Sequence, residues 1–364
     1  MAPLSRLCVG RKAALRPELW SRGLAPARRI MLVSEPKVWR LYGPQVSRAW
    51  RRAGWRLHSH LLPAGEAAKT WPAVSRLLRD MLRHGLGRDA ALAALGGGTT
   101  LDAAGFAAAV YLRGIPWVSM PTTLLAQVDA GIGGKTALNL DEGKNLIGAF
   151  HQPLAVVCDT ACLDSLPRRD LFSGLAEAIK LALVHDPSWL AALRRDWPRL
   201  RDGDPAALRR LVRRAAAAKL AIVARDPRET RSVRERLNFG HTVGHALEAA
   251  AGFASLRHGE AVACGMRAAL RLSQAYAGLP AATAADLDGW LRDIPVPRLE
   301  LRPSAVLAHL RRDKKMRRGR PRFVLLNAAG RTTTSVDVPG LGIREAVRSI
   351  LHELRRPRPQ GAQS

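Results

Sequence analysis

Apolar residues over the first 160 positions fall into short unbroken runs separated by stretches with helical spacing. The runs are typical of buried strands and occupy residues 29–34, 55–62, 90–95, 116–120 and 154–158. Between the second and third runs, residues 71–84 carry apolar side chains at helical spacing. Strands that alternate with helices predict a parallel sheet, and such sheets bind ligands beyond the carboxyl ends of their strands.

From residue 169 onward the pattern changes to helical spacing almost throughout. We expect helices at residues 171–184, 189–193, 206–224, 242–250, 260–276 and 284–291. A length of 364 residues exceeds what one hydrophobic core usually supports. We therefore predict two domains, residues 1–160 and 161–354, followed by a disordered tail at residues 355–364.

The charge balance is strongly basic, with 58 Lys and Arg against 30 Asp and Glu, or a formal net charge of +28. Such a balance is typical of proteins that bind nucleic acid, membrane surfaces or acidic small molecules. Arginine is scattered through the predicted helices beside abundant alanine, which favours a coding bias over a nucleic-acid role. The densest basic run, residues 311–322, holds no aromatic side chain that would stack on bases. We expect no nucleic-acid partner.

The four cysteines, Cys8, Cys158, Cys162 and Cys264, form no CxxC pair and no zinc-type spacing. They are interpreted as reduced thiols of a cytoplasmic protein. The first residues lack an apolar segment of export-signal length, and no run of about 18 apolar residues occurs. We expect neither export nor a membrane partner.

Gly96, Gly97 and Gly98 follow the third strand-type run and precede a predicted helix that begins near Leu101. Glycines let backbone N–H groups approach a pyrophosphate, and the helix N-terminus adds its dipole. A plain tight turn explains the triplet equally well, and Asp102 can serve the helix dipole alone.

Two lysines stand among glycines, Lys135 after Gly133-Gly134 and Lys144 after Gly143. Lysine in this setting suits a phosphate or a hydroxyl-rich anion. The end of this motif is similar to a P-loop, but Asp129 stands where a P-loop needs its first glycine. An NTPase P-loop is therefore excluded.

Three of the ten histidines lie in residues 238–260. His241 and His245 are spaced to share one helix face, and His258 follows in a His-Gly-Glu sequence. Neutral imidazoles presented in this way can bind a metal or transfer protons, although a structural pair is an equal alternative. Thr242 occupies the place of the catalytic Glu in HExxH, which argues against a metalloprotease.

Glu177 and Lys180 share a face of a helix whose other residues are almost all apolar. The alternative is a surface salt bridge, which would stabilise the helix by about 0.3 kcal/mol. Charged side chains on a buried helix favour a functional role.

These motifs occur together in one order: GGGTTLDAAG, MPTTLLAQVDAGIGGKTALNLDEGKN, GLAEAIK, NFGHTVGHALE, RHGEAVACGM and DKKMRRGRPRFVLL. In this the chain resembles the 3-dehydroquinate synthases over about residues 29–326. The resemblance implies an α/β fold with a Rossmann-like parallel-sheet NAD-binding domain, followed by an all-helical metal-binding domain. It also implies a homodimer that converts 3-deoxy-D-arabino-heptulosonate 7-phosphate, a phosphorylated sugar acid, to 3-dehydroquinate and phosphate. NAD and a divalent metal, zinc or cobalt, are the implied cofactors.

The resemblance also implies roles for single residues. The metal ligands are Glu177, His241 and His258, with His245 beside them as a candidate for proton transfer. The substrate phosphate is assigned to Arg113, Lys135, Asn145, Lys314 and Lys315, of which Arg113 serves the neighbouring subunit. The substrate carboxylate is assigned to Lys219, Arg234 and Asn238, and the reacting hydroxyls to Asp129 and Lys180. NAD is assigned to Glu66, Lys69, Gly97, Gly98, Asp102, Thr122, Thr123, Lys144 and Ser165.

Two stretches depart from the family's pattern. The first strand ends in Ser34-Glu35 with Lys37 following, where the family has Thr-Asp and then Asn. The turn before Arg234 reads Ser-Val-Arg in place of Gly-Leu-Arg. These departures bear on the adenosine contacts and the pose of Arg234. A related cyclase acting on another sugar phosphate stays an alternative.

Overall fold

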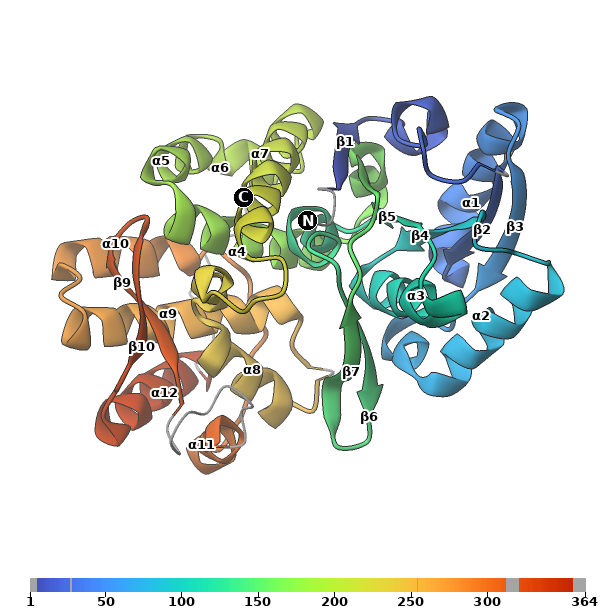
Figure 1. The fold of residues 1–364 in the computed structure, drawn as a ribbon. Coiled ribbons are helices and arrows are strands. Elements are labelled where there is room, and N and C mark those ends of the chain that lie inside the picture. The colour runs from blue at the N-terminus through green and yellow to red at the C-terminus, as the bar shows by residue number, and fades with distance from the viewer. Residues whose placement is uncertain (1–4, 27, 254, 312–320, 356–364) are drawn as a thin grey trace. The chain divides into compact units, whose positions relative to one another are not determined.

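The computed structural model describes residues 5–26, 28–253, 255–311 and 321–355. Contacts divide the chain into two compact units (Figure 1). The first comprises Met1–Pro167 with Arg199–Arg228, and the second comprises Arg168–Pro198 with Glu229–Ser364. Helix α7 (Pro205–Arg225) belongs to the first unit because it packs on β1 (Arg6–Gly10). The predicted boundary near residue 160 stays a prediction.

The first unit is built on a six-stranded sheet whose order is β1-β8-β5-β4-β2-β3. All of its strand pairs are parallel. The strands after β1 are β2 (Arg29–Ser34), β3 (Arg56–Leu61), β4 (Ala91–Gly96), β5 (Trp117–Pro121) and β8 (Ala155–Asp159). These five are the strands that the apolar runs predict, whereas β1 has no counterpart among the predictions.

Both faces of this sheet are covered by helices. Ile30 and Leu32 lie in the core under α1 (Pro36–Arg52), whereas Met31 and Val33 face the core formed with α2 (Trp71–Arg83) and α3 (Gly98–Val110). Every residue of β4 is buried. Burial on both faces explains why the strands are continuous apolar runs without polar alternation.

The order of the strands reverses between β2 and β4. From β2 the chain continues to β3 on one side, and then returns to β4 and β5 on the other. Parallel sheets bind ligands at such a switch point, beyond the carboxyl ends of the strands. Gly97 and Gly98 follow β4 at that edge, and Thr122 and Thr123 follow β5.

Between β5 and β8 the chain forms a separate antiparallel hairpin of β6 (Lys135–Leu140) and β7 (Gly143–Phe150). It was not predicted, because its glycines and lysines were interpreted as a phosphate-binding loop. Gly134 has a φ of +64°, and a Cβ there would lie 2.8 Å from the Gln152 side chain. The glycine is therefore required by the turn that opens the hairpin.

The second unit is mainly helical. Its helices are α4 (Arg168–His185), α5 (Pro187–Arg195), α8 (His241–Ala250), α9 (His258–Tyr276), α10 (Ala281–Leu291), α11 (Pro303–Arg311) and α12 (Gly340–Arg355), and the short α6 (Trp197–Arg201) crosses the division between units. A hairpin of β9 (Phe323–Ala328) and β10 (Arg331–Val336) adds strands that an all-helical domain would lack.

The end of the chain differs from the prediction in two ways. Arg355, which was placed in the tail, is instead the last residue of α12, and residues 356–364 lie outside the described residues. Helix α12 itself was not predicted. It packs on α9 through buried side chains that include Ile343, Val347 and Ile350.

Candidate metal and cofactor sites

Three histidines of the second unit lie together. His241 is the first residue of α8, His245 follows one turn later, and His258 is the first residue of α9. One ring nitrogen of each lies within 4.8 Å of the others. The ring centroids of His241 and His258 are 5.3 Å apart. Two helix starts thus bring together imidazoles that are 17 residues apart in sequence.

Glu177 lies beside this cluster in the middle of α4, with 1% of its surface exposed. Its Oε1 atom is 3.6 Å from Nε2 of His241 and 3.5 Å from Nε2 of His258. These distances exceed a hydrogen bond. Two atoms bound to one tetrahedral zinc ion stand about 3.3 Å apart, so the three side chains fit a shared divalent ion.

The polar atoms of Glu177 support the same interpretation. Neither of its carboxylate oxygens has a hydrogen-bond partner among the described residues. Lys180, one turn further along α4, forms an ion pair with the second oxygen. A buried carboxylate without hydrogen bonds is costly unless cations compensate it.

Protonation in this cluster is set by burial and by neighbouring charge. Burial opposes ionisation of Glu177, but Lys180 and His241 hold its pKa well below the ordinary value. Burial, and then Lys180, lower the pKa of His241 well below its ordinary value. Burial also lowers that of His258, but Glu177 and Glu248 outweigh it and raise the pKa to about 9. The cluster therefore combines an ionised carboxylate with a neutral His241.

Close packing of α8 on α9 places the histidines. A Cβ on Gly265 would lie 1.9 Å from the carbonyl oxygen of Gly240, so the backbones touch at this crossing. Gly240 precedes His241 with a φ of +79°, a conformation that favours glycine. The glycines around the histidines are thus part of how the cluster forms.

The His-Gly-Glu sequence also ties α9 to the start of α4. Glu260 accepts a 2.7 Å hydrogen bond from Nη2 of Arg169, whose Nε contacts its other oxygen at 2.5 Å. It also accepts a 2.8 Å bond from the backbone N–H of Arg257, which caps the helix. This link holds His258 next to the helix that carries Glu177.

The predicted carboxylate-binding residues fall in both units. Arg234 and Asn238 lie in the 3-10 turn Val233–Asn238, and Arg234 is buried. Lys219 is in α7 of the first unit, where it donates a 2.7 Å hydrogen bond to the Asp129 carbonyl and contacts the Asp129 carboxylate. The structure thus pairs Lys219 with Asp129. A shared site for Lys219, Arg234 and Asn238 stays a prediction.

At the carboxyl edge of the sheet, Lys69 joins two predicted residues. Its Nζ is 2.6 Å from Oδ2 of Asp102, and it also contacts the side-chain oxygen of Asn145. Asn145 has a φ of +57°. Although Lys69 and Asp102 were assigned to NAD and Asn145 to the substrate phosphate, all three meet here.

A second pair lies at the same edge. Nζ of Lys144 is 3.0 Å from Oε1 of Glu66. Asn139, which the sequence interpretation missed, donates a 2.7 Å hydrogen bond to Glu66 and accepts a 3.0 Å bond from the Asn145 backbone. Burial raises the pKa of Glu66, but Asn139 and Lys144 outweigh it and lower the pKa below the ordinary value. The hairpin thus presents its polar residues to the edge.

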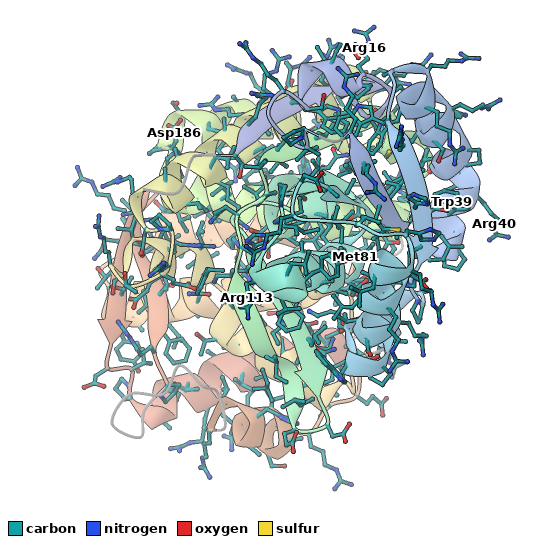
Figure 2. The ribbon with its side chains drawn as sticks, turned by 45° about the vertical axis from the view of Figure 1, so that its right-hand side comes forward. Arg16, Trp39, Arg40, Met81, Arg113 and Asp186 are labelled. Carbon is teal, nitrogen blue, oxygen red and sulfur yellow. The ribbon has the colours of Figure 1, made fainter. Side chains whose placement is uncertain are left out.

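Three further predicted site residues are exposed, and two lie outside the described residues. Ser165 is exposed at the end of the turn after β8, where its hydroxyl contacts that of Tyr42. Lys135 is exposed at the start of β6. Arg113, which Figure 2 labels, follows α3; it is exposed and has a φ of +69°. Lys314 and Lys315 lie outside the described residues.

The sequence interpretation also missed Glu248 and Glu260, which contact His258 and Arg169. Glu248 follows His241 by seven residues, or about two helical turns. That spacing places the side chains of His241 and Glu248 on one helix face, so helical periodicity in the sequence could have identified Glu248.

Within the described ranges, no helix combines the length and the apolar composition needed to cross a bilayer.

The chain matches the family model "3-dehydroquinate synthase N-terminal" over residues 59–173 and "3-dehydroquinate synthase C-terminal" over residues 174–316. It is 43% identical over 325 residues to the 3-dehydroquinate synthase of Bordetella pertussis, covering 89% of this chain and 90% of that protein.

Two solved structures are similar over nearly the whole chain. The 2-epi-5-epi-valiolone synthase of Streptomyces hygroscopicus, with NAD+ and Zn2+ bound, has a TM-score of 0.84 and 30% identity, covering 97% of this chain and 98% of that one. A 2-deoxy-scyllo-inosose synthase complexed with carbaglucose-6-phosphate, NAD+ and Co2+ has a TM-score of 0.85 and 26% identity, covering 94% and 96%. These similarities confirm the predicted fold class.

Proposed function

The chain belongs to the 3-dehydroquinate synthase family, and we propose that it converts 3-deoxy-D-arabino-heptulosonate 7-phosphate to 3-dehydroquinate and phosphate, with NAD and a divalent metal ion as cofactors. The observation that carries the proposal is the buried Glu177 carboxylate 3.5 and 3.6 Å from two imidazole nitrogens. Family membership supplies the reaction class, and this cluster supplies the chemistry that the reaction needs.

In this proposal Glu177, His241 and His258 hold the metal, and Lys180 and His245 stand beside it. When bound, the metal and NAD together polarise a substrate alcohol and take up and return its hydride. Glu177 brings one negative charge to the ion, and the neutral His241 brings a lone pair. His245 is placed in the same cluster to move a proton.

Cationic side chains bind the substrate's anionic groups. Lys135, Asn145, Arg113, Lys314 and Lys315 bind the phosphate, and Lys219, Arg234 and Asn238 bind the carboxylate. Buried Arg234 supports this role, because a buried guanidinium suits a planar anion. Asp129, ion-paired with Lys219, orients a reacting hydroxyl. We propose that the local excess of positive charge serves to bind the phosphate and the carboxylate of the substrate.

NAD binds at the carboxyl edge of the sheet in this proposal. Gly97 and Gly98, at the N-terminus of α3, take the pyrophosphate. The remaining NAD contacts are Glu66, Lys69, Asp102, Thr122, Thr123, Lys144 and Ser165. The reversal of strand order beside β4 supports this location.

The proposal includes a cytoplasmic homodimer. None of the four cysteines forms a disulfide, which suits a reducing compartment. Leu146, Ile147 and Phe150 of β7 are 37%, 41% and 48% exposed, an apolar surface that a second copy would cover. Arg113, exposed on the same unit, then serves the partner's phosphate site.

The experiment that tests the function follows phosphate and NADH with substrate in large excess over NAD. Because the hydride is returned in each cycle, phosphate should form in many-fold excess over NAD, with 3-dehydroquinate as the identified product. Accumulation of NADH in step with turnover, or a halt after one equivalent of NAD, would contradict the proposal. Parallel assays with other sugar phosphates separate this activity from that of a related cyclase.

A further inference from the structure

Each ring nitrogen of His258 faces a carboxylate oxygen. Its Nδ1 atom is 2.9 Å from Oε2 of Glu248, which is a hydrogen-bond distance. Its Nε2 atom is 3.5 Å from Oε1 of Glu177, which is not. The two carboxylates therefore differ in what they do to the ring: Glu248 bonds to it directly, whereas Glu177 leaves room for an ion.

Glu248 reaches His258 because α8 crosses α9 closely. Its side chain is 12% exposed, so it is largely removed from solvent. It shares its helix face with His241, two turns earlier. Burying a carboxylate is costly unless it is paired. The hydrogen bond between Glu248 and His258 provides such a pairing.

The bond determines which nitrogen of His258 carries its lone pair. A neutral imidazole has one N–H and one lone pair. Metal binding displaces one proton from the ring. When the remaining Nδ1–H donates to Glu248, the lone pair is on Nε2, which is the atom that faces Glu177. A carboxylate partner on a ligating histidine fixes the ring and raises the basicity of the ligating nitrogen.

We propose that Glu248 is a positioning residue of the metal site, which holds the His258 ring so that its Nε2 lone pair is presented beside Glu177. This inference rests on the metal site of the proposed function. It adds a residue on α8 that acts through His258 without touching substrate or metal.

Metal binding by the protein tests the proposal directly. Metal-free protein is titrated with Co2+ against a chromophoric chelator, and the visible absorption of the bound Co2+ is recorded. We expect Glu248→Ala to weaken Co2+ binding by about 10–100-fold and to change the absorption bands. Glu248→Gln keeps the side chain's shape and an acceptor oxygen without the charge, so its affinity should lie between that of the alanine variant and that of the parent.

Asp80 gives a matched control, because its carboxylate is 2.6 Å from Nδ1 of His60 in the first unit. Asp80→Asn should bind Co2+ as the parent does. If Glu248→Ala fails to fold, Glu248→Gln decides. Parent-like affinity and spectrum in every Glu248 variant that folds would overturn the proposal, as would a parent that binds no Co2+.

The proposed function can fail separately. A parent that binds Co2+ but yields no 3-dehydroquinate contradicts the function and leaves the role of Glu248 standing. A parent that turns over normally, with Glu248 variants that bind Co2+ as tightly, contradicts the role of Glu248 alone.

Discussion

Gly259 lies directly against Ser173, so that α9 begins in contact with α4. The backbone N–H of Gly259 donates a 2.9 Å hydrogen bond to the Ser173 hydroxyl. A Cβ on Gly259 would lie 2.0 Å from the Ser173 carbonyl oxygen, which no side chain can do without displacing backbone. Because His258 and Glu177 lie on these two helices, this contact sets their separation.

Gly259→Ala should therefore push α9 away from α4. We expect a loss of about 1–3 kcal/mol in the free energy of unfolding and weaker metal retention, measured by thermal denaturation and metal analysis. Gly289→Ala in α10 is the control, since a Cβ there meets nothing within 4 Å. That variant should be as stable as the parent or more so. Equal behaviour of the two variants would contradict the contact's role.

Replacing any one of Glu177, His241 or His258 by alanine should remove one proposed metal ligand. We expect at least about a 100-fold loss of turnover, or about 2.7 kcal/mol, together with less bound metal. Metal content is measured by elemental analysis of dialysed protein. Near-normal turnover with full metal content in all three variants would defeat the assignment.

Lys69→Met should weaken NAD binding, because Asp102 would lose the ammonium 2.6 Å from its carboxylate. We expect the NAD dissociation constant to rise about tenfold, or about 1.4 kcal/mol, in a fluorescence titration. Arg83→Met is the control, since Arg83 pairs with Asp80 at an exposed position. An unchanged constant for Lys69→Met would remove Lys69 from the cofactor site.

Glu35 and Lys37 stand at the carboxyl end of β2, next to the switch point of the sheet. If they contact the adenosine end of NAD, Glu35→Asp combined with Lys37→Asn should change the NAD dissociation constant a few-fold, by less than about 1.4 kcal/mol. A calorimetric titration measures this change. No change would mean that neither side chain touches the cofactor.

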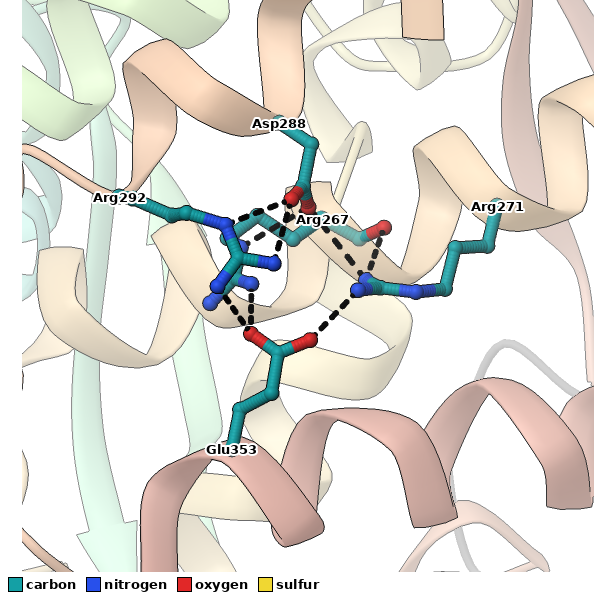
Figure 3. Close-up of polar contacts among 5 residues, drawn as sticks. All are labelled: Arg267, Arg271, Asp288, Arg292 and Glu353. Carbon is teal, nitrogen blue, oxygen red and sulfur yellow. Dashed lines mark hydrogen bonds and ion pairs between the residues drawn. The ribbon is translucent and has the colours of Figure 1, made fainter. Parts of the chain in front are cut away.

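Asp288 and Glu353 are shared among three arginines, Arg267, Arg271 and Arg292 (Figure 3). Burial opposes ionisation of both carboxyls, but the arginines hold each pKa below its ordinary value. A carboxyl whose pKa is lower in the folded state than in the unfolded state stabilises the protein above its unfolded pKa, which is about 4. That stability is lost as the pH falls through the folded pKa.

Asp288→Asn combined with Glu353→Gln should therefore lower the free energy of unfolding at pH 7 by roughly 1–3 kcal/mol. The difference from the parent should vanish in strong acid, which thermal melts across the acid range measure. Glu300→Gln is the control, because Glu300 is 76% exposed in its pair with Arg298. A difference that is constant with pH would rule out the ion-pair explanation.

Local pattern determined much of the fold. The apolar runs predicted five of the six strands of the parallel sheet, because strands buried on both faces need unbroken apolar sequence. Helical spacing predicted α2, α4, α5, α7, α8, α9 and α10, with boundaries shifted by a few residues. The hairpins β6–β7 and β9–β10 were missed. Polar residues interrupt β6 and β7, whereas the apolar run that opens β9 is confined to residues 323–326.

The candidate metal cluster was only partly contained in the sequence. The spacing of His241 and His245 indicates one helix face by itself, since both lie on α8. That Glu177 meets His258 was implied by family resemblance, and its physical cause lies in the tertiary structure. Gly259 against Ser173, and Gly265 against Gly240, allow three helices to touch at their backbones.

Tertiary structure alone decided the partners of several charged residues. In three pairs the two residues lie on different elements, so their spacing in sequence does not indicate that they meet. These pairs are Glu248 with His258, Lys69 with Asp102, and Lys219 with Asp129. Periodicity reports which face of one helix or strand a side chain occupies. Which other element that face meets depends on packing between distant segments, and no local pattern encodes it.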